Sequence, residues 1–97
     1  MQQVPQSILS ILDAYHGSSL EITEFRNAEG YVFFRIVGID THVRMWTDVN
    51  NVCRCMIERG YEYYGTGQGD TPESALQSAL SSLDKQIERY QYRDVQS

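Results

Sequence analysis

A stripe of large apolar residues predicts a helix in the C-terminal third of the chain. Its members recur at spacings of three and four, which places them on one helical face. The stripe consists of Leu76, Leu80, Leu83, Ile87 and Tyr90. Ala75 and Ala79 flank it, and their small side chains would let the helix approach a sheet closely.

The start of this helix is marked by capping residues. Thr71 is a good N-cap, Pro72 suits the first helical position, and Glu73 brings a negative charge to the positive helix end. Asp70 is an alternative cap, with Glu73 as its capping-box partner. Residues 91–97 carry no apolar periodicity, and we expect a frayed tail there.

A shorter helix is predicted from about Pro5 to Tyr15, because apolar residues again share one face. They are Ile8, Ile11, Leu12 and Tyr15. Gly17 follows as a stop, and His16 lies in the last turn, where a positive charge is favoured.

Three segments rich in aromatic and β-branched residues follow, at 20–26, 31–37 and 42–47. The turns between them, at 27–30 and 38–41, are short, and short turns join consecutive strands into an antiparallel meander. The middle segment is apolar on both faces, which is typical of a central strand.

Residues 48–59 fit two structures. A helix capped by Asp48 would bury Val52 and Met56, whereas a hairpin turn at 48–51 would lead into a fourth strand. We favour the helix and keep the hairpin as the alternative.

The remaining segments complete the predicted fold. Residues 61–64 are expected to be extended, and Gly65–Gly69 to form a loop before the long helix. The chain is thus predicted to be one α+β domain over residues 1–97. It contains an antiparallel meander of three to four strands, with the N-terminal and C-terminal helices packed mainly on one face and the middle helix as an addition.

Composition narrows the class of function. The 97 residues carry a formal net charge of −5, and an acidic chain is disfavoured for non-specific nucleic-acid binding, which depends on neutralising phosphates. No apolar run approaches the ~20 residues that cross a bilayer, and no basic-then-apolar leader precedes Val4. We therefore expect a cytoplasmic protein without a membrane partner, located in the host cytoplasm if it is phage-encoded.

The glycine-rich segment is one candidate site. Gly65, Gly67 and Gly69 precede a helix N-terminus, the arrangement that binds phosphate in nucleotide sites. Their spacing is not that of a nucleotide motif, and Asp70 and Glu73 lie where the phosphate would sit. We interpret the segment as a turn, and a small enzyme or ligand binder at this loop is the third functional hypothesis.

No catalytic or metal-binding motif is recognisable. His16 and His42 stand apart from any motif with Ser, Cys or a carboxylate, and no metal-ligand spacing occurs. Cys53 and Cys55 are too close in sequence for a relaxed disulfide and lack the second ligand pair of a zinc site, so we expect reduced thiols. The prediction is a non-enzymatic protein without catalytic residues, metal or cofactor.

Alternation along the strands sorts their side chains onto two faces. Val32, Phe34, Ile36, Val43 and Met45 would lie under the helices. The other face would carry the candidate partner-binding residues Phe25, Tyr31, Phe33, Arg35, His42, Arg44 and Trp46. Aromatic residues mixed with Arg are typical of binding hot spots and of surfaces that stack single-stranded bases. The middle helix, the tail or a second copy of the chain in a homodimer are the alternative covers of this face.

The order of elements and one short motif carry a resemblance to known families. A helix, a three-strand meander and a glycine-containing loop before a C-terminal helix resemble the α-β-β-β-α layout of double-stranded-RNA-binding domains. Gly69 to Ala75, read as G-D-T-P-E-S-A, is similar to the G-D-T-x-x-E-A helix start of HicB-type antitoxins. The layout is also similar to small phage and prophage proteins, including inhibitors of host defence systems. The RNA-binding family has basic residues at the start of its last helix, where this chain has Asp70, Pro72 and Glu73, which disfavours RNA binding in that mode.

The main functional hypothesis is a small interaction protein that binds a protein partner stoichiometrically. The resemblance implies a phage-type inhibitor of a host defence complex, similar to anti-CRISPR proteins, or of a regulatory complex. The acidic chain would compete for a nucleic-acid-binding surface on that partner by charge complementarity. The alternative is a nucleic-acid-binding module that uses the aromatic and Arg face.

Overall fold

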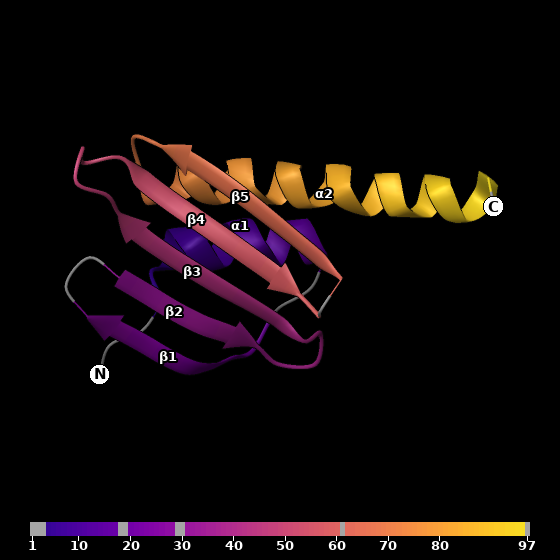
Figure 1. The fold of residues 1–97 in the computed structure, drawn as a ribbon. Coiled ribbons are helices and arrows are strands. Elements are labelled where there is room, and N and C mark those ends of the chain that lie inside the picture. The colour runs from indigo at the N-terminus through magenta and orange to yellow at the C-terminus, as the bar shows by residue number, and fades with distance from the viewer. Residues whose placement is uncertain (1–3, 18–19, 29–30, 61, 97) are drawn as a thin grey trace.

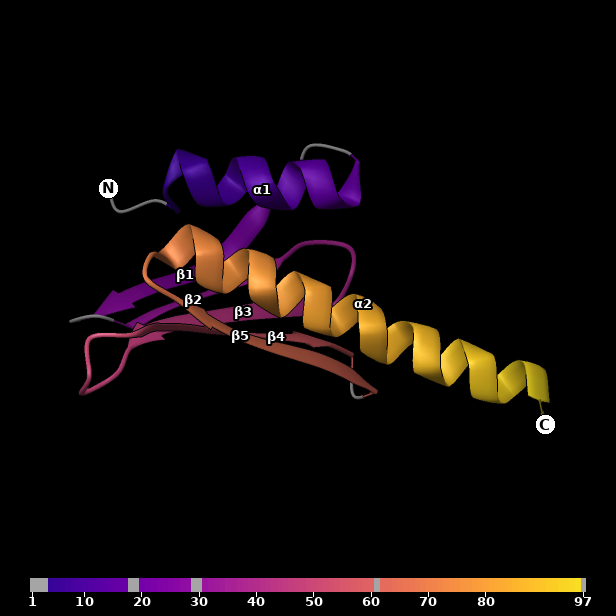
Figure 2. The same cartoon turned by 90° about the horizontal axis from the view of Figure 1, so that it is seen from above.

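The chain folds into one antiparallel sheet with two helices on one side, as a computed structural model shows (Figure 1, Figure 2). The structure describes residues 4–17, 20–28, 31–60 and 62–96. The elements in chain order are α1 (Gln6–His16), β1 (Ile22–Ala28), β2 (Tyr31–Ile36), β3 (Thr41–Thr47), β4 (Cys53–Arg59), β5 (Tyr63–Gly69) and α2 (Pro72–Gln96). Strand neighbours follow chain order, from β1 to β5. The predicted α+β class and antiparallel meander are confirmed, with five strands rather than three to four.

Helix α1 forms where the apolar spacing predicts it. Its inward residues Ile8 and Leu12 are buried. It ends at Gly17, which adopts a left-handed conformation (φ 72°) and donates its backbone N–H to the Asp13 carbonyl at 2.8 Å. The predicted glycine stop is therefore confirmed, because a residue without Cβ enters this conformation at little cost.

Helix α2 begins at the predicted cap. The Thr71 hydroxyl accepts the backbone N–H of Ser74 at 3.1 Å, and the Ser74 hydroxyl accepts the N–H of Thr71 at 3.3 Å. These reciprocal bonds satisfy two donors that a helix start leaves free. The tail prediction is wrong for residues 91–96, because α2 continues through Gln96 and extends beyond the sheet (Figure 1).

The predicted middle helix is wrong, and the hairpin alternative holds. Asp48 accepts the backbone N–H groups of Asn50 at 2.9 Å and Val52 at 3.1 Å, which closes a turn. Asn51 takes the positive φ of 65° that this turn needs. Strand β4 then pairs with β3, and its alternate residues Cys55 and Ile57 enter the core. Tertiary pairing thus decides between two structures that the local pattern allows.

The glycine-rich segment is a strand and not the predicted loop. Gly65, Gly67 and Gly69 occur at every second position, so all three face α2. A Cβ at Gly65 would come within 2.3 Å of the Ala79 carbonyl oxygen, and one at Gly67 within 2.3 Å of the Ala79 backbone nitrogen. The glycines therefore permit backbone-to-backbone packing of strand on helix. Tyr61, predicted to be extended, lies outside the described residues.

The free edge of β5 is covered by α2. The backbone N–H of Tyr64 donates to the Gln86 side chain, and that of Thr66 donates to the Ser82 hydroxyl at 3.4 Å. Exposed strand edges attract further strands. Helix α2 therefore closes one edge of the sheet as well as one face.

The core lies between the sheet and the two helices. The sheet contributes Phe34, Ile36, Val43, Met45, Cys55 and Ile57, and the helices contribute Ile8, Leu12, Ala75, Leu76, Ala79, Leu80 and Leu83. Ala75 and Ala79 bring α2 close to the glycine strand, as their size predicts. No disulfide joins Cys53 and Cys55. Neither helix, over the residues that the structure describes, has the length and apolar character to span a bilayer.

Candidate functional site

One face of the sheet is left uncovered by both α1 and α2 (Figure 2). The antiparallel register aligns its side chains in cross-strand rows. The rows are Tyr31–Trp46–Arg54–Gln68, Phe33–Arg44–Met56–Thr66 and Arg35–His42–Glu58–Tyr64. We call these residues the open face.

Six of the seven predicted site residues lie together on this face. Strands β2 and β3 bring them together in directly opposed pairs. The pairs are Tyr31 with Trp46, Phe33 with Arg44, and Arg35 with His42. Cross-strand neighbours have Cβ atoms about 4.5–5.5 Å apart, close enough for their side chains to act together.

Phe25 is the exception, and its predicted place on the open face is wrong. A bulge between Thr23 and Arg26 adds a residue to β1, and Glu24 there has a φ of 54°. One extra residue reverses which face the following side chains occupy. Phe25 therefore packs against the core, and Arg26 takes the position opposite Phe33.

The centre of the open face is a stacked cluster. The Phe33 and His42 rings lie 5.8 Å apart at an interplanar angle of 24°, and the Arg44 guanidinium lies 5.9 Å from the Phe33 ring centre. Arg35 donates to His42 Nε2 from Nε at 2.9 Å. His42 Nε2 is the acceptor in this bond, since a guanidinium group can only donate. The cluster combines ring faces, which stack, with guanidinium groups, which bind carboxylates and rings.

Arginines and carboxylates alternate around this cluster. Three ion pairs join Arg35 to Glu24 at 3.7 Å, Arg44 to Glu58 at 3.8 Å and Arg54 to Asp48 at 2.8 Å. The arginine side chains are 41–44% exposed, so solvent screens these pairs and each contributes little to stability. The pairs thus balance charge on the open face more than they hold the fold together.

Asp48 also fixes the register that builds the face. Its carboxylate accepts Arg54 Nε at 2.8 Å in addition to two backbone N–H groups. These bonds, led by the one from Arg54, lower the pKa of Asp48 below its ordinary value. The turn sets Trp46 opposite Arg54 and so extends the site onto β4.

Sequence reasoning missed the β4 and β5 members of the open face. These are Arg54, Met56, Glu58, Tyr64, Thr66 and Gln68. Because residues 48–59 were predicted as a helix and the glycines as a loop, neither strand was expected in the sheet. A signal was present, because Arg54, Met56 and Glu58 alternate with Cys55 and Ile57, at the spacing of two that a strand needs.

His16 has a structural environment away from this face. Its Nδ1 donates to the Leu12 carbonyl at 2.9 Å, and its Nε2 accepts from Arg59 at 2.8 Å. The ring therefore ties the end of α1 to strand β4. No cluster of three or more His, Cys, Asp or Glu suited to a metal ion occurs within the described residues.

Comparison with known proteins gave no relative for this chain: no family model, curated protein or solved structure matches it.

Proposed function

We propose that this chain is a non-enzymatic interaction domain that binds a protein partner through its open face. The observation that carries the proposal is the array of Tyr, Phe, Trp and Arg side chains on β2, β3 and β4, on the sheet face opposite the helices. Tyr31 and Arg44 are exposed, and Phe33 and Trp46 are half-buried. Aromatic residues and Arg dominate the energetics of protein interfaces. Flat sheet faces of this composition suit stoichiometric binding.

The charge pattern favours a protein over a nucleic acid as partner. Arg35, Arg44 and Arg54 each have a carboxylate neighbour within 4 Å. Phosphate binding needs cations that are free to release counterions. A protein partner, by contrast, carries both signs of charge on its surface, so it can form new ion pairs with these arginines and carboxylates.

The biological role that we propose for this binding is inhibition of a host defence or regulatory complex by a phage-type protein. The small size and the net charge of −5 support it, because an acidic domain is attracted to basic surfaces that bind nucleic acid. The acids of the helical side, such as Asp70 and Asp84, would contribute to that attraction.

A nucleic-acid-binding module is the second candidate. The stacked Phe33 and His42 rings beside Arg44 favour it, because bases stack on such platforms. Fluorescence anisotropy with short single-stranded RNA and DNA decides between the two. Binding that weakens steeply with salt supports the nucleic-acid module, and no binding at low salt removes it.

Charge reversal on the open face tests the main proposal. The immobilised domain captures proteins from a native host lysate that has been treated with nuclease, and mass spectrometry identifies them. Arg44→Glu is expected to reduce capture of the specific partner by about tenfold or more. Lys85→Glu, at an exposed position of α2, is the matched charge reversal and should leave capture unchanged.

Thermal unfolding of both variants accompanies the capture experiment. The proposal requires that Arg44→Glu unfolds within a few degrees of the wild type, since its ion pair is exposed. Equal capture by Arg44→Glu and wild type would contradict binding through this face. Trp46→Ala provides a second variant, which should lose the partner while the domain stays folded.

A further inference from the structure

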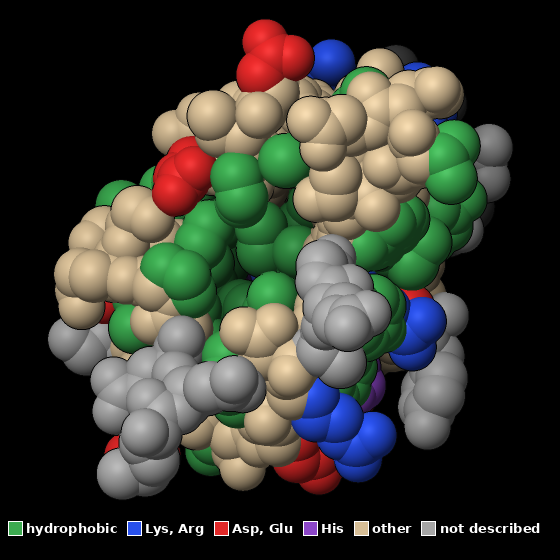
Figure 3. Space-filling model, turned by 90° about the vertical axis from the view of Figure 1, so that its left-hand side faces the viewer, with side chains coloured by type: hydrophobic (Ala, Val, Ile, Leu, Met, Phe, Trp, Pro, Cys, Tyr) green, Lys and Arg blue, Asp and Glu red, His purple; other side chains and the backbone are tan. Residues whose placement is uncertain are grey.

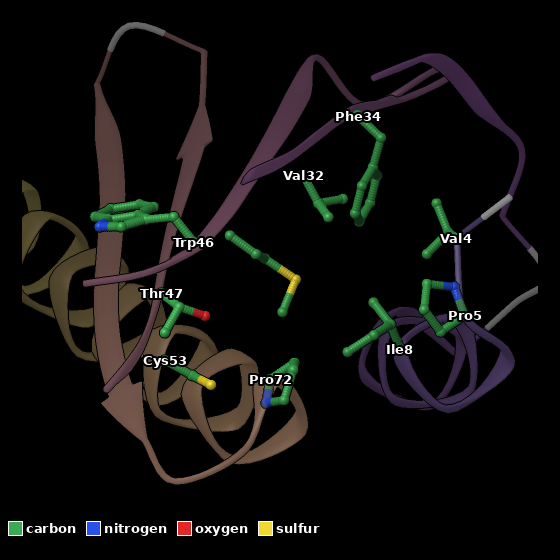
Figure 4. Close-up of a pocket in the computed structure, with 10 residues that line it drawn as sticks. Val4, Pro5, Ile8, Val32, Phe34, Trp46, Thr47, Cys53 and Pro72 are labelled. Atoms are coloured by element: carbon green, nitrogen blue, oxygen red, sulfur yellow. The ribbon is translucent and has the colours of Figure 1, made fainter. Parts of the chain in front are cut away.

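A cavity of about 190 Å³ lies at the end of the sheet where β3 ends and β4 begins. Its wall combines the first turn of α1, the strands β2, β3 and β4, and the start of α2. The side chains of Ile8, Phe34 and Pro72 approach the same space from three separate elements (Figure 4). Because the wall belongs to packed elements, the cavity exists before any ligand arrives.

The cavity opens to the surface. Seen from the left side of Figure 1, hydrophobic side chains line a hollow on this face of the molecule (Figure 3). Thr47, at its rim, is exposed, and Cys53 is half-buried. Trp46 is the one lining residue that also belongs to the open face, and its ring points away from the other lining side chains (Figure 4).

The residues that line the cavity disfavour a charged ligand. Thr47 and Cys53 supply a hydroxyl and a thiol to an otherwise hydrophobic lining, and the thiol donates weakly to the Asp70 carbonyl at 3.8 Å. Glu73 follows the lining residue Pro72 and accepts the Ser7 hydroxyl at 2.7 Å, which clasps α1 to α2 beside the cavity. The apolar wall disfavours a bound anion, and Glu73 adds a negative charge next to the lining residue Pro72.

The volume limits the size of the ligand. An apolar cavity of about 150 Å³ holds benzene, whereas drug-sized ligands need about 300–1,000 Å³. We propose that this cavity is a binding site for a small neutral apolar molecule built around a single aromatic ring. Its hydrocarbon part fills the space beside Phe34 and Met45, and a small polar substituent reaches the Thr47 hydroxyl at the rim.

Cys53 provides the test, because a ligand in the cavity covers its thiol. The wild-type chain is alkylated with iodoacetamide in the presence of toluene or of benzoate, which share a ring and differ in charge. Cys55 does not interfere, since it is buried and its pKa is raised to about 12 by that burial. Toluene should slow alkylation of Cys53 at least fivefold, saturably, with a midpoint on the order of 1 mM. Benzoate should have no such effect.

Filling the cavity gives an independent test. Val32→Phe places a ring in the space from β2, and it should abolish protection of Cys53 by toluene without lowering the melting temperature. Val37→Phe is the matched control, at an exposed position of the β2–β3 turn, and should keep the protection.

Three results of the alkylation assay would overturn the site. They are alkylation of the wild type that is insensitive to toluene, equal protection by benzoate, and toluene protection that persists in a folded Val32→Phe variant. If Val32→Phe does not fold, the comparison of toluene with benzoate on the wild type decides alone. Saturable shifts of the Met45 and Ile8 methyl resonances with toluene must accompany the protection, and their absence also overturns the site.

Discussion

Replacing Gly67 by alanine tests how α2 packs on β5. The added Cβ would lie 2.3 Å from the Ala79 backbone nitrogen and 2.4 Å from the Ala75 carbonyl oxygen. Helix and strand must separate by roughly 0.7 Å to relieve the clash to 3.0 Å and by roughly 1.1 Å to reach ordinary contact at 3.4 Å. Both opposing atoms are backbone, so no change of rotamer relieves the overlap.

The expected cost is about 2–2.5 kcal/mol of unfolding free energy. Overpacking of a well-packed core costs about 1–3 kcal/mol, and this site lies at the upper end because the clash is with backbone. The loss of unfolded-state entropy on replacing glycine returns about 0.5–1 kcal/mol. For a domain of this size such a change lowers the melting temperature by about 8–20 °C.

Urea unfolding followed by far-UV circular dichroism measures this cost. Gly17→Ala is the matched control, because a Cβ there meets nothing within 4 Å and only the positive φ of 72° is strained. It should cost about 1 kcal/mol. Ala79→Gly should not rescue Gly67→Ala, since the clash involves the Ala79 backbone nitrogen. An unfolding midpoint for Gly67→Ala equal to that of the wild type would contradict the backbone contact between α2 and β5. It would favour the loop that the sequence predicts for this segment.

Three further predictions concern titrating groups. Burial, and then the hydrogen bond to Asp84, raise the pKa of Tyr15 to about 12. The stabilisation by Tyr15 is therefore complete below pH ~10 and is lost as the pH rises towards ~12. The difference in unfolding free energy between wild type and Tyr15→Phe should shrink by about 1 kcal/mol over that range, a small change because the ring is partly exposed. The pKa of Asp48 is lowered by its hydrogen bonds, so the stability advantage of the wild type over Asp48→Asn should be present at neutral pH and disappear as the pH falls through and below ~4, and a constant difference would contradict it. The buried Cys55 thiol, with its pKa raised to about 12, should resist iodoacetamide in the folded chain, so that mass spectrometry finds one label, on Cys53, until the protein is denatured.

The helices were largely predictable from the sequence because their determinants are local. Thr71 caps α2, Gly17 ends α1, and the apolar stripes lie within a few turns of the chain. The alternation of side chains along β2 and β3 also placed them on the correct faces of the sheet, and with them six candidate residues of the open face. A face of a helix or of a strand is set by the spacing along its own segment.

The strands β4 and β5 could not be fixed in the same way. The segment 48–59 has apolar residues that suit either period, and only pairing with β3 selects the strand. The glycines of β5 have no side chain to show alternation, so their structural role appears only where α2 packs against them.

The bulge at Glu24 adds only one residue to β1, yet it changes which β1 side chains lie on the open face. It moves Phe25 into the core and brings Arg26 to the open face. The sequence by itself determined the helices, the two central strands and the mixed aromatic and Arg chemistry. Only the tertiary structure decided the number of strands, the extent of the open face and the apolar cavity at its end, because these depend on contacts between segments far apart in the chain.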